Sequence, residues 1–173
     1  YPVYNVKLKL HNVDPVTGEG EIVAKGPNVM LGYYKDPVRT RSVFTDDGWF
    51  RTSDIAVQDE KGRFYIKGRN SNMILGPSGE NIYPEEIENV LNNVEGVGES
   101  IVVERNGRLV ALVSPIEGFI EWDEASEDKF YEKLAHWKAK ILNITNKSVN
   151  KSSQVSSIEV MKEPFEKTAT QKI

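Results

Sequence analysis

The stretch Gly79-Glu80-Asn81-Ile82-Tyr83-Pro84-Glu85-Glu86-Ile87-Glu88 sets the architecture of the second half of the chain. Gly79 predicts a turn, and Pro84 suits the first position of a helix, where its missing N–H costs nothing. The two glutamates after it fall in the positively polarised first turn. Apolar residues then recur with helical spacing at Ile87, Val90, Leu91 and Val94. The stretch therefore predicts a turn followed by a helix that packs one face on a core.

A hairpin and a second helix are expected further along. Asn106-Gly107 separates the apolar runs 101–103 and 109–113, and this dipeptide favours two-residue hairpin turns. Helical spacing then recurs over a longer stretch at Phe130, Leu134, Trp137, Ile141 and Ile144. The stretch 146–153 has no periodicity and is expected to be a loop, whereas Ile158 and Val160 indicate one more strand. This half is therefore predicted to be an α+β layer with a roughly three-stranded sheet.

The opening third is predicted to be β-rich. Val6, Leu8 and Leu10 alternate with polar residues, and the turn at 14–18 leads into a strand at 20–25, which suggests a hairpin. A second hairpin is expected from the runs 55–57 and 63–67. Asp36 and Pro37 predict the start of a short helix between the two hairpins, because aspartate caps free amides.

A change of composition suggests a domain boundary. Gly68-Arg69-Asn70-Ser71-Asn72 is small and polar, as expected of a connector or hinge. We therefore divide the chain into 1–67 and 68–173. Tyr1 is neither an initiator methionine nor part of a signal-peptide pattern, so the chain is expected to be a fragment of a longer protein.

Composition excludes several classes of protein. The 173 residues are 39% hydrophobic and 28% charged, and no apolar run reaches the length of a membrane span. The net charge of −4 gives no electrostatic reason to expect nucleic acid as the partner. No cysteine is present, and the two histidines, His11 and His136, are far apart in the expected layout, so no metal site is predicted.

Four motifs, taken in order, resemble the C-terminal part of adenylate-forming enzymes: acyl-CoA synthetases, luciferases and the adenylation domains of peptide synthetases. In chain order these motifs are 20–34 (GEIVAKGPNVMLGYY), 48–54 (GWFRTSD), Gly68-Arg69 with 79–88, and 164–173. The last of them resembles a Pro-x-Thr-x-x-Gly-Lys-Ile motif in stretched form. The string 72–84 looks most like bacterial long-chain-fatty-acid–CoA ligases.

The resemblance implies an activity for the full-length enzyme. A carboxylic acid, expected to be a fatty acid, and MgATP would give acyl-AMP and pyrophosphate, and the acyl group would then pass to CoA. Residues 1–67 would end the large domain and 68–173 would be a mobile C-terminal domain. The upstream domain would supply the phosphate loop and acyl pocket, so this fragment is expected to be inactive alone and to hold none of these ligands tightly.

The resemblance also assigns roles to single residues. Asp54 would accept hydrogen bonds from the ATP ribose hydroxyls, although an isolated Asp more often belongs to a turn. Ser53 stands where the family usually has Gly. Arg69 would contact ribose or phosphate, against the ordinary alternative of a solvated surface arginine. Ser71 falls at the hinge, where the family usually has Asp or Lys.

Two further roles belong to the catalytic steps. The loop at Gly79 would let the backbone approach the pantetheine arm of CoA during thioester formation. Lys172 would offset the negative charge that builds up when a carboxylate attacks the α-phosphate. Only the resemblance distinguishes Lys172 from Lys162 or Lys167, and Gln171 replaces the family's usual Gly beside it.

Two alternatives remain open. In the first, the acceptor thiol belongs to a carrier protein instead of CoA; in the second, the chain is a non-catalytic binding module that shares the fold. A cytoplasmic location is expected, and a peripheral contact with the inner membrane face is compatible with the sequence.

Overall fold

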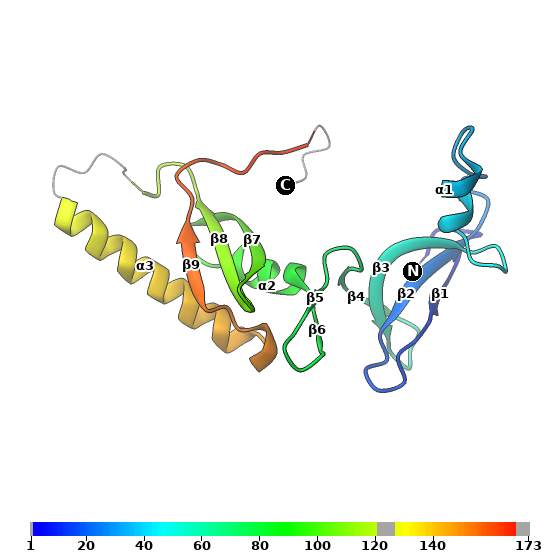
Figure 1. Ribbon diagram of the computed structural model, residues 1–173, viewed down its shortest axis with the longest axis horizontal. Coiled ribbons are helices and arrows are strands. Elements are labelled where there is room, and N and C mark those ends of the chain that lie inside the picture. The colour runs from blue at the N-terminus through cyan, green and yellow to red at the C-terminus, as the bar shows by residue number, and fades with distance from the viewer. Residues whose placement is uncertain (1, 121–126, 169–173) are drawn as a thin grey trace. The chain divides into compact units, whose positions relative to one another are not determined.

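The computed structural model describes residues 2–120 and 127–168 (Figure 1). The chain divides into two compact units, Tyr1–Asn72 and Met73–Ile173. Each unit has its own sheet, and the mixed α+β class predicted from sequence is confirmed. The assignment of 1–67 to a large domain and of 68–173 to a mobile one stays a prediction.

The first unit is a four-stranded antiparallel sheet in the order β1-β2-β3-β4. Its elements are β1 (Lys7–His11), β2 (Gly20–Lys25), α1 (Pro37–Ser42), β3 (Phe50–Gln58) and β4 (Phe64–Arg69). Both predicted hairpins are present. The predicted cap is confirmed too, since the Asp36 carboxylate accepts the Arg39 N–H at 2.9 Å and Pro37 opens α1.

The second unit contains a three-stranded sheet in the order β7-β8-β9 and a small hairpin. Its elements are β5 (Ile74–Leu75), β6 (Asn81–Ile82), α2 (Pro84–Leu91), β7 (Val97–Arg105), β8 (Arg108–Pro115), α3 (Glu127–Ser148) and β9 (Ser157–Val160). Strands β7 and β8 form the antiparallel hairpin predicted at Asn106-Gly107, and both turn residues have positive φ. Strand β9 pairs with β8 in parallel.

The core of this unit lies between the sheet and the two helices. Helix α2 packs against β7, and α3 packs against β9 and α2. Ile87 and Leu91 are fully buried, as the face of α2 predicted. Of the stripe expected on α3, Trp137 and Ile141 are buried in the core, whereas Ile144 is partly exposed. The prediction of a core-facing stripe therefore holds for the middle of α3.

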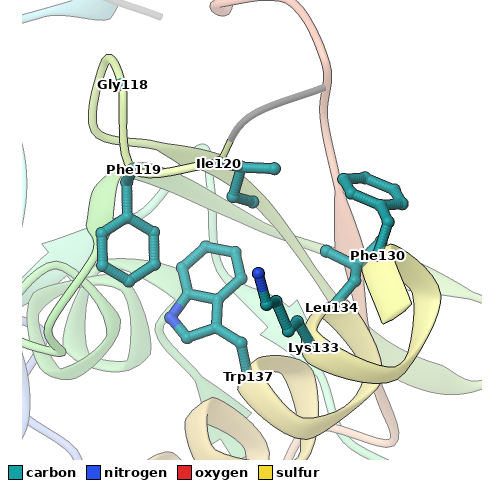
Figure 2. A pocket seen from close by; sticks show the side chains of 7 residues that line it. All are labelled: Gly118, Phe119, Ile120, Phe130, Lys133, Leu134 and Trp137. Atoms are coloured by element: carbon teal, nitrogen blue, oxygen red, sulfur yellow. The ribbon is translucent and has the colours of Figure 1, made fainter. Parts of the chain in front are cut away.

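The N-terminal part of α3 borders a pocket of about 360 Å³ (Figure 2). The side chains that line it are mostly apolar: Phe119, Ile120, Phe130, Leu134 and Trp137, together with Lys133. The Trp137 indole packs against Phe119, with ring centroids 5.2 Å apart, and donates its N–H to the Glu95 carbonyl. Phe130 and Leu134 thus line this pocket.

The expectation of a loop at 146–153 is wrong for its first residues. Helix α3 runs to Ser148, and a single 3-10 turn covers Lys151–Ser153. The Asn146 side chain accepts the Val155 N–H and donates to the Val155 carbonyl, both at 2.9 Å. Because this contact reaches nine residues along the chain, helix periodicity could not reveal it.

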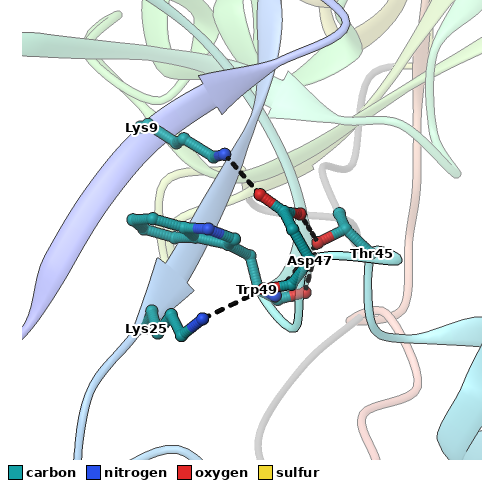
Figure 3. Close-up of polar contacts among 5 residues, drawn as sticks. All are labelled: Lys9, Lys25, Thr45, Asp47 and Trp49. Carbon is teal, nitrogen blue, oxygen red and sulfur yellow. Dashed lines mark hydrogen bonds and ion pairs between the residues drawn. The ribbon is translucent and has the colours of Figure 1, made fainter.

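A polar cluster closes the turn before β3 (Figure 3). Lys9 and Lys25 lie over the Trp49 indole, with Nζ 4.5 and 5.8 Å from the ring centroid. The Asp47 carboxylate accepts hydrogen bonds from the Thr45 hydroxyl at 2.6 Å and Lys9 Nζ at 3.1 Å. These two contacts lower the pKa of Asp47 to about 2, and the hydrogen bond from the Thr45 hydroxyl has the larger effect.

We expect Asp47→Asn to lower the thermal unfolding midpoint at neutral pH but not in acid. A carboxyl whose pKa is lowered on folding stabilises the fold above its ordinary pKa, near 4, and loses that effect as the pH falls through about 2. Unfolding curves of wild type and variant should therefore converge between about pH 4 and pH 2. The neighbouring exposed carboxylate provides a control, Asp46→Asn, which should leave the midpoint unchanged. An equal difference at every pH would contradict the assignment.

Candidate functional site

A bulge between β2 and β3 shapes the motif at 48–54. Val23 pairs with Arg51 and Glu21 with Ile55, so Ile22 alone lies opposite Thr52, Ser53 and Asp54. The Thr52 hydroxyl donates to the Ile22 carbonyl at 2.8 Å and accepts the Asp54 N–H at 3.1 Å. Extra residues of this kind re-aim side chains at functional sites. Here they direct Asp54 toward the neighbouring strand β4.

The backbone at Ser53 explains the glycine that the family usually has there. Ser53 has a φ of +64°, in the left-handed region that glycine adopts most easily. Its N–H donates to Glu21 Oε1 at 3.0 Å, and its carbonyl accepts the Asn70 N–H at 2.9 Å. Ser53 therefore keeps a glycine-like conformation without being glycine.

Asp54 and Arg69, both predicted to bind nucleotide, lie together. They are paired residues of β3 and β4, and Arg69 Nε is 3.2 Å from Asp54 Oδ1. Their side chains are 32% and 53% exposed, so both remain accessible to a ligand. A carboxylate beside a guanidinium offers acceptors for hydroxyl groups and a fork of donors for phosphate oxygens.

Ser71 lies just beyond this pair, in the connector. It is exposed, and its hydroxyl donates to the Asn72 side-chain oxygen at 3.0 Å. The Asn72 N–H donates to the Arg69 carbonyl at 3.0 Å, which makes a tight turn at the end of the first unit. The hinge role of Ser71 stays a prediction.

Gly79 belongs to the loop that joins β5 and β6 in the second unit. Its φ is +85°, and a Cβ built there would have no heavy atom within 4 Å. The Gly79 N–H donates to the Gly76 carbonyl at 2.9 Å, and the Glu80 side chain accepts the Ser78 N–H at 3.0 Å. Gly79 is thus exposed at the tip of an ordered turn that requires its backbone conformation.

A hollow of about 410 Å³ borders the base of this loop. Leu75, Gly76 and Pro77 line one side, while Arg108 and Ser156 are among the residues lining the rest. Arg108 is exposed and follows the Asn106-Gly107 turn, so it presents a positive charge at the rim. The hollow combines an apolar wall with the cation of Arg108 and the carboxylate of Glu104.

Lys172 lies outside the described residues. Two other lysines near the C-terminal motif, Lys162 and Lys167, lie within them. Lys167 forms an ion pair with Glu99 of β7, whereas the side chain of Lys162 is exposed. Lys167 therefore has a structural partner on β7.

Glu21 is a residue of this site to which we assigned no role from sequence. It is only 7% exposed, and its Oε2 accepts from Arg51 Nε at 2.9 Å and Nη2 at 2.7 Å. A signal was available, because Glu21 is the single charged residue in the otherwise buried run Gly20–Ala24. Buried carboxylates of this kind are nearly always paired.

Two other kinds of site are absent from the part of the chain that is described. There, no group of three or more histidine, cysteine or acidic residues is placed to hold a metal ion. Across the same residues, no helix is both long and apolar enough to cross a bilayer.

Known proteins with similar sequences include several CoA ligases. Indoleacetate–CoA ligase of Aromatoleum aromaticum is 44% identical over 113 residues, which are 62% of this chain and 22% of the ligase. A long-chain-fatty-acid–CoA ligase of Mycobacterium tuberculosis is 40% identical over 129 residues, 70% of this chain and 24% of the enzyme. The chain thus spans about a quarter of these relatives. No family model matches it.

Solved structures agree with this result. The o-succinylbenzoate CoA synthetase of Bacillus subtilis, in complex with its acyl-adenylate intermediate, superposes with a TM-score of 0.77 at 25% identity, over 99% of this chain and 33% of that one. The chain is homologous to the C-terminal part of adenylate-forming CoA ligases. Acids named for related ligases range from fatty acids to indoleacetate, 2-succinylbenzoate and sulfoacetate, so these homologues are not specifically fatty-acid ligases.

Proposed function

We propose that this chain is the C-terminal part of an ATP-dependent acid–thiol ligase. In the first half-reaction a carboxylate oxygen attacks the α-phosphorus of MgATP, and pyrophosphate leaves. In the second, the thiol of CoA attacks the acyl carbon, and AMP leaves. The observation that carries the proposal is the pair of Asp54 and Arg69, held 3.2 Å apart at the bulge and open to solvent.

The chemistry of this pair fits the ribose and phosphates of ATP. An ionised carboxylate only accepts hydrogen bonds, so Asp54 suits two vicinal hydroxyls. The planar guanidinium of Arg69 offers several donors to phosphate oxygens. Mg²⁺ would arrive with the nucleotide, and Lys172 would offset the negative charge of the first step.

The second unit supplies features that suit the thioester step. Gly79 gives the loop a tip without a side chain, so a narrow pantetheine arm can pass close to the backbone. Arg108 at the rim of the adjoining hollow suits the phosphates of CoA. Both features lie in one compact unit. A mobile C-terminal domain that turns about Ser71 would carry them together.

A finer proposal concerns the acid. We propose a long-chain fatty acid, because the string 72–84 resembles ligases of that class and one such ligase is among the relatives. The acyl pocket would belong to the upstream domain, which is the expected partner of this chain. A cytoplasmic enzyme, with peripheral contact at the inner membrane face, is consistent with that substrate.

The test is a two-step assay on the full-length enzyme. ATP–pyrophosphate exchange should depend on a carboxylic acid, and formation of a CoA ester should follow with the same acid. A panel of palmitate, indoleacetate, 2-succinylbenzoate and sulfoacetate separates the fatty-acid proposal from the broader one. Exchange without transfer to CoA, but with transfer to a phosphopantetheine carrier protein, would favour the alternative acceptor. No exchange with any acid would favour a binding module.

A further inference from the structure

Glu21 is a buried carboxylate without a part in either half-reaction as proposed. Its two oxygens accept three donors: the Ser53 N–H on Oε1, and Nε and Nη2 of Arg51 on Oε2. Burying a charge is costly unless it is paired and hydrogen-bonded, and here both oxygens are occupied. The side chain thus joins strand β2 to the bulged part of β3.

The bulge creates the need for such a side chain. Because Ile22 alone lies opposite three residues of β3, the strand pairing of β2 provides no regular partner for the Ser53 N–H. Glu21 provides the acceptor, and the Asn70 N–H binds the Ser53 carbonyl from the other side. Both backbone groups of Ser53 are therefore fixed.

The conformation of Ser53 makes this support necessary. A left-handed φ of +64° is disfavoured for serine but ordinary for glycine. Asp54 follows directly, so the direction of its carboxylate depends on the angles at Ser53. The chain lacks the family's glycine at this position, and the hydrogen bond from Ser53 to Glu21 stabilises the same conformation.

We infer that Glu21 is a positioning residue for nucleotide binding: it holds Ser53 in the left-handed conformation and thereby aims the Asp54 carboxylate at the ribose beside Arg69. This inference rests on the proposed function. The inference goes beyond the proposed function because it assigns ribose selectivity to a side chain that does not touch the nucleotide.

The full-length enzyme allows a direct test with 3′-deoxy-ATP, which lacks one ribose hydroxyl. The readout is the ratio of kcat/KM for ATP to kcat/KM for this analogue. Loss of a hydrogen bond to a charged group should make the wild-type ratio about tenfold to a hundredfold, and Asp54→Ala should reduce it to about one. Glu21→Gln should lower the ratio toward that of Asp54→Ala, because an amide has one acceptor oxygen for donors on both sides.

A second substitution tests the route by which Glu21 acts. Glycine holds a positive φ without help, so adding Ser53→Gly to Glu21→Gln should restore most of the ratio. The matched control is Glu60→Gln, an exposed carboxylate on the β3–β4 turn, which should leave the ratio at its wild-type value. Thermal unfolding of each variant reports its stability separately.

The outcomes separate the inference from the proposed function. If Asp54→Ala keeps the wild-type ratio, Asp54 does not bind ribose and the proposed function loses its main support. Suppose that Asp54→Ala reduces the ratio to about one, whereas Glu21→Gln lowers the unfolding midpoint and leaves the ratio at its wild-type value. Glu21 is then merely structural and the inference is overturned. Failure of Ser53→Gly to rescue would overturn it too. A lower ratio in Glu21→Gln, restored in the double variant with Ser53→Gly, supports the inference.

Discussion

Replacing Lys172 with alanine in the full-length enzyme is expected to slow acyl-adenylate formation by roughly a thousandfold. Attack of a carboxylate on the α-phosphate brings two anions together, and a cation between them stabilises the transition state. At ~4 Å and an effective dielectric near 20, one such contact is worth about 4 kcal/mol, which corresponds to that factor. The measurement is carboxylate-dependent ATP–pyrophosphate exchange.

Two neighbouring lysines control for the loss of charge in the tail. Lys162→Ala removes an exposed charge and should leave exchange unchanged. Lys167→Ala removes the ion pair with Glu99, so it should affect the thermal midpoint more than the rate. Transfer of preformed acyl-AMP to CoA should continue in Lys172→Ala. Normal adenylation in that variant would show that the assignment of Lys172 is wrong.

Gly79→Leu is expected to impair thioester formation by about tenfold to a hundredfold while sparing adenylation. The loop requires a φ of +85°, which is strained for leucine, and the added side chain would occupy the path of the pantetheine arm. A Cβ at Gly79 meets no heavy atom within 4 Å, so the first atom of the new side chain is not crowded. Single-turnover assays should follow the two half-reactions separately.

Gly79→Asn separates the two causes, because asparagine tolerates a positive φ better than other residues with side chains. If the pantetheine arm needs the space, Gly79→Asn should also slow transfer to CoA. If only the turn matters, it should resemble wild type. Equal loss of both half-reactions in Gly79→Leu would indicate misfolding and contradict the assigned role.

Local signals in the sequence predicted most of the fold. Asn106-Gly107, Asp36 and Pro84 each act through their own backbone preferences, and each appears in the structure where expected. The end of α3 could not be predicted in this way, because the hydrogen bonds between Asn146 and Val155 are tertiary. The parallel pairing of β9 with β8 likewise depends on a contact across a long stretch of chain.

The candidate site was predictable to a different extent. Asp54 and Arg69 were identified by motif, and the structure places them side by side. Glu21 lies within a motif, but its sequence predicts no role for it, because the role we infer depends on which residue lies opposite it across two strands. The positive φ of Ser53 could not be predicted from the residue type, because serine does not favour that conformation.

The bulge in β3 has a consequence for how this strand can vary. Side chains of a strand alternate between faces, so removing one residue between Arg51 and Ile55 would invert every position on one side of the gap. Ala56, which is fully buried, would then lie on the opposite face of the sheet, and an adjacent residue would take its buried position. Strand β3 should therefore accept substitutions at Thr52 or Ser53 far more readily than a change in length, and an insertion or deletion there should prevent the first unit from folding.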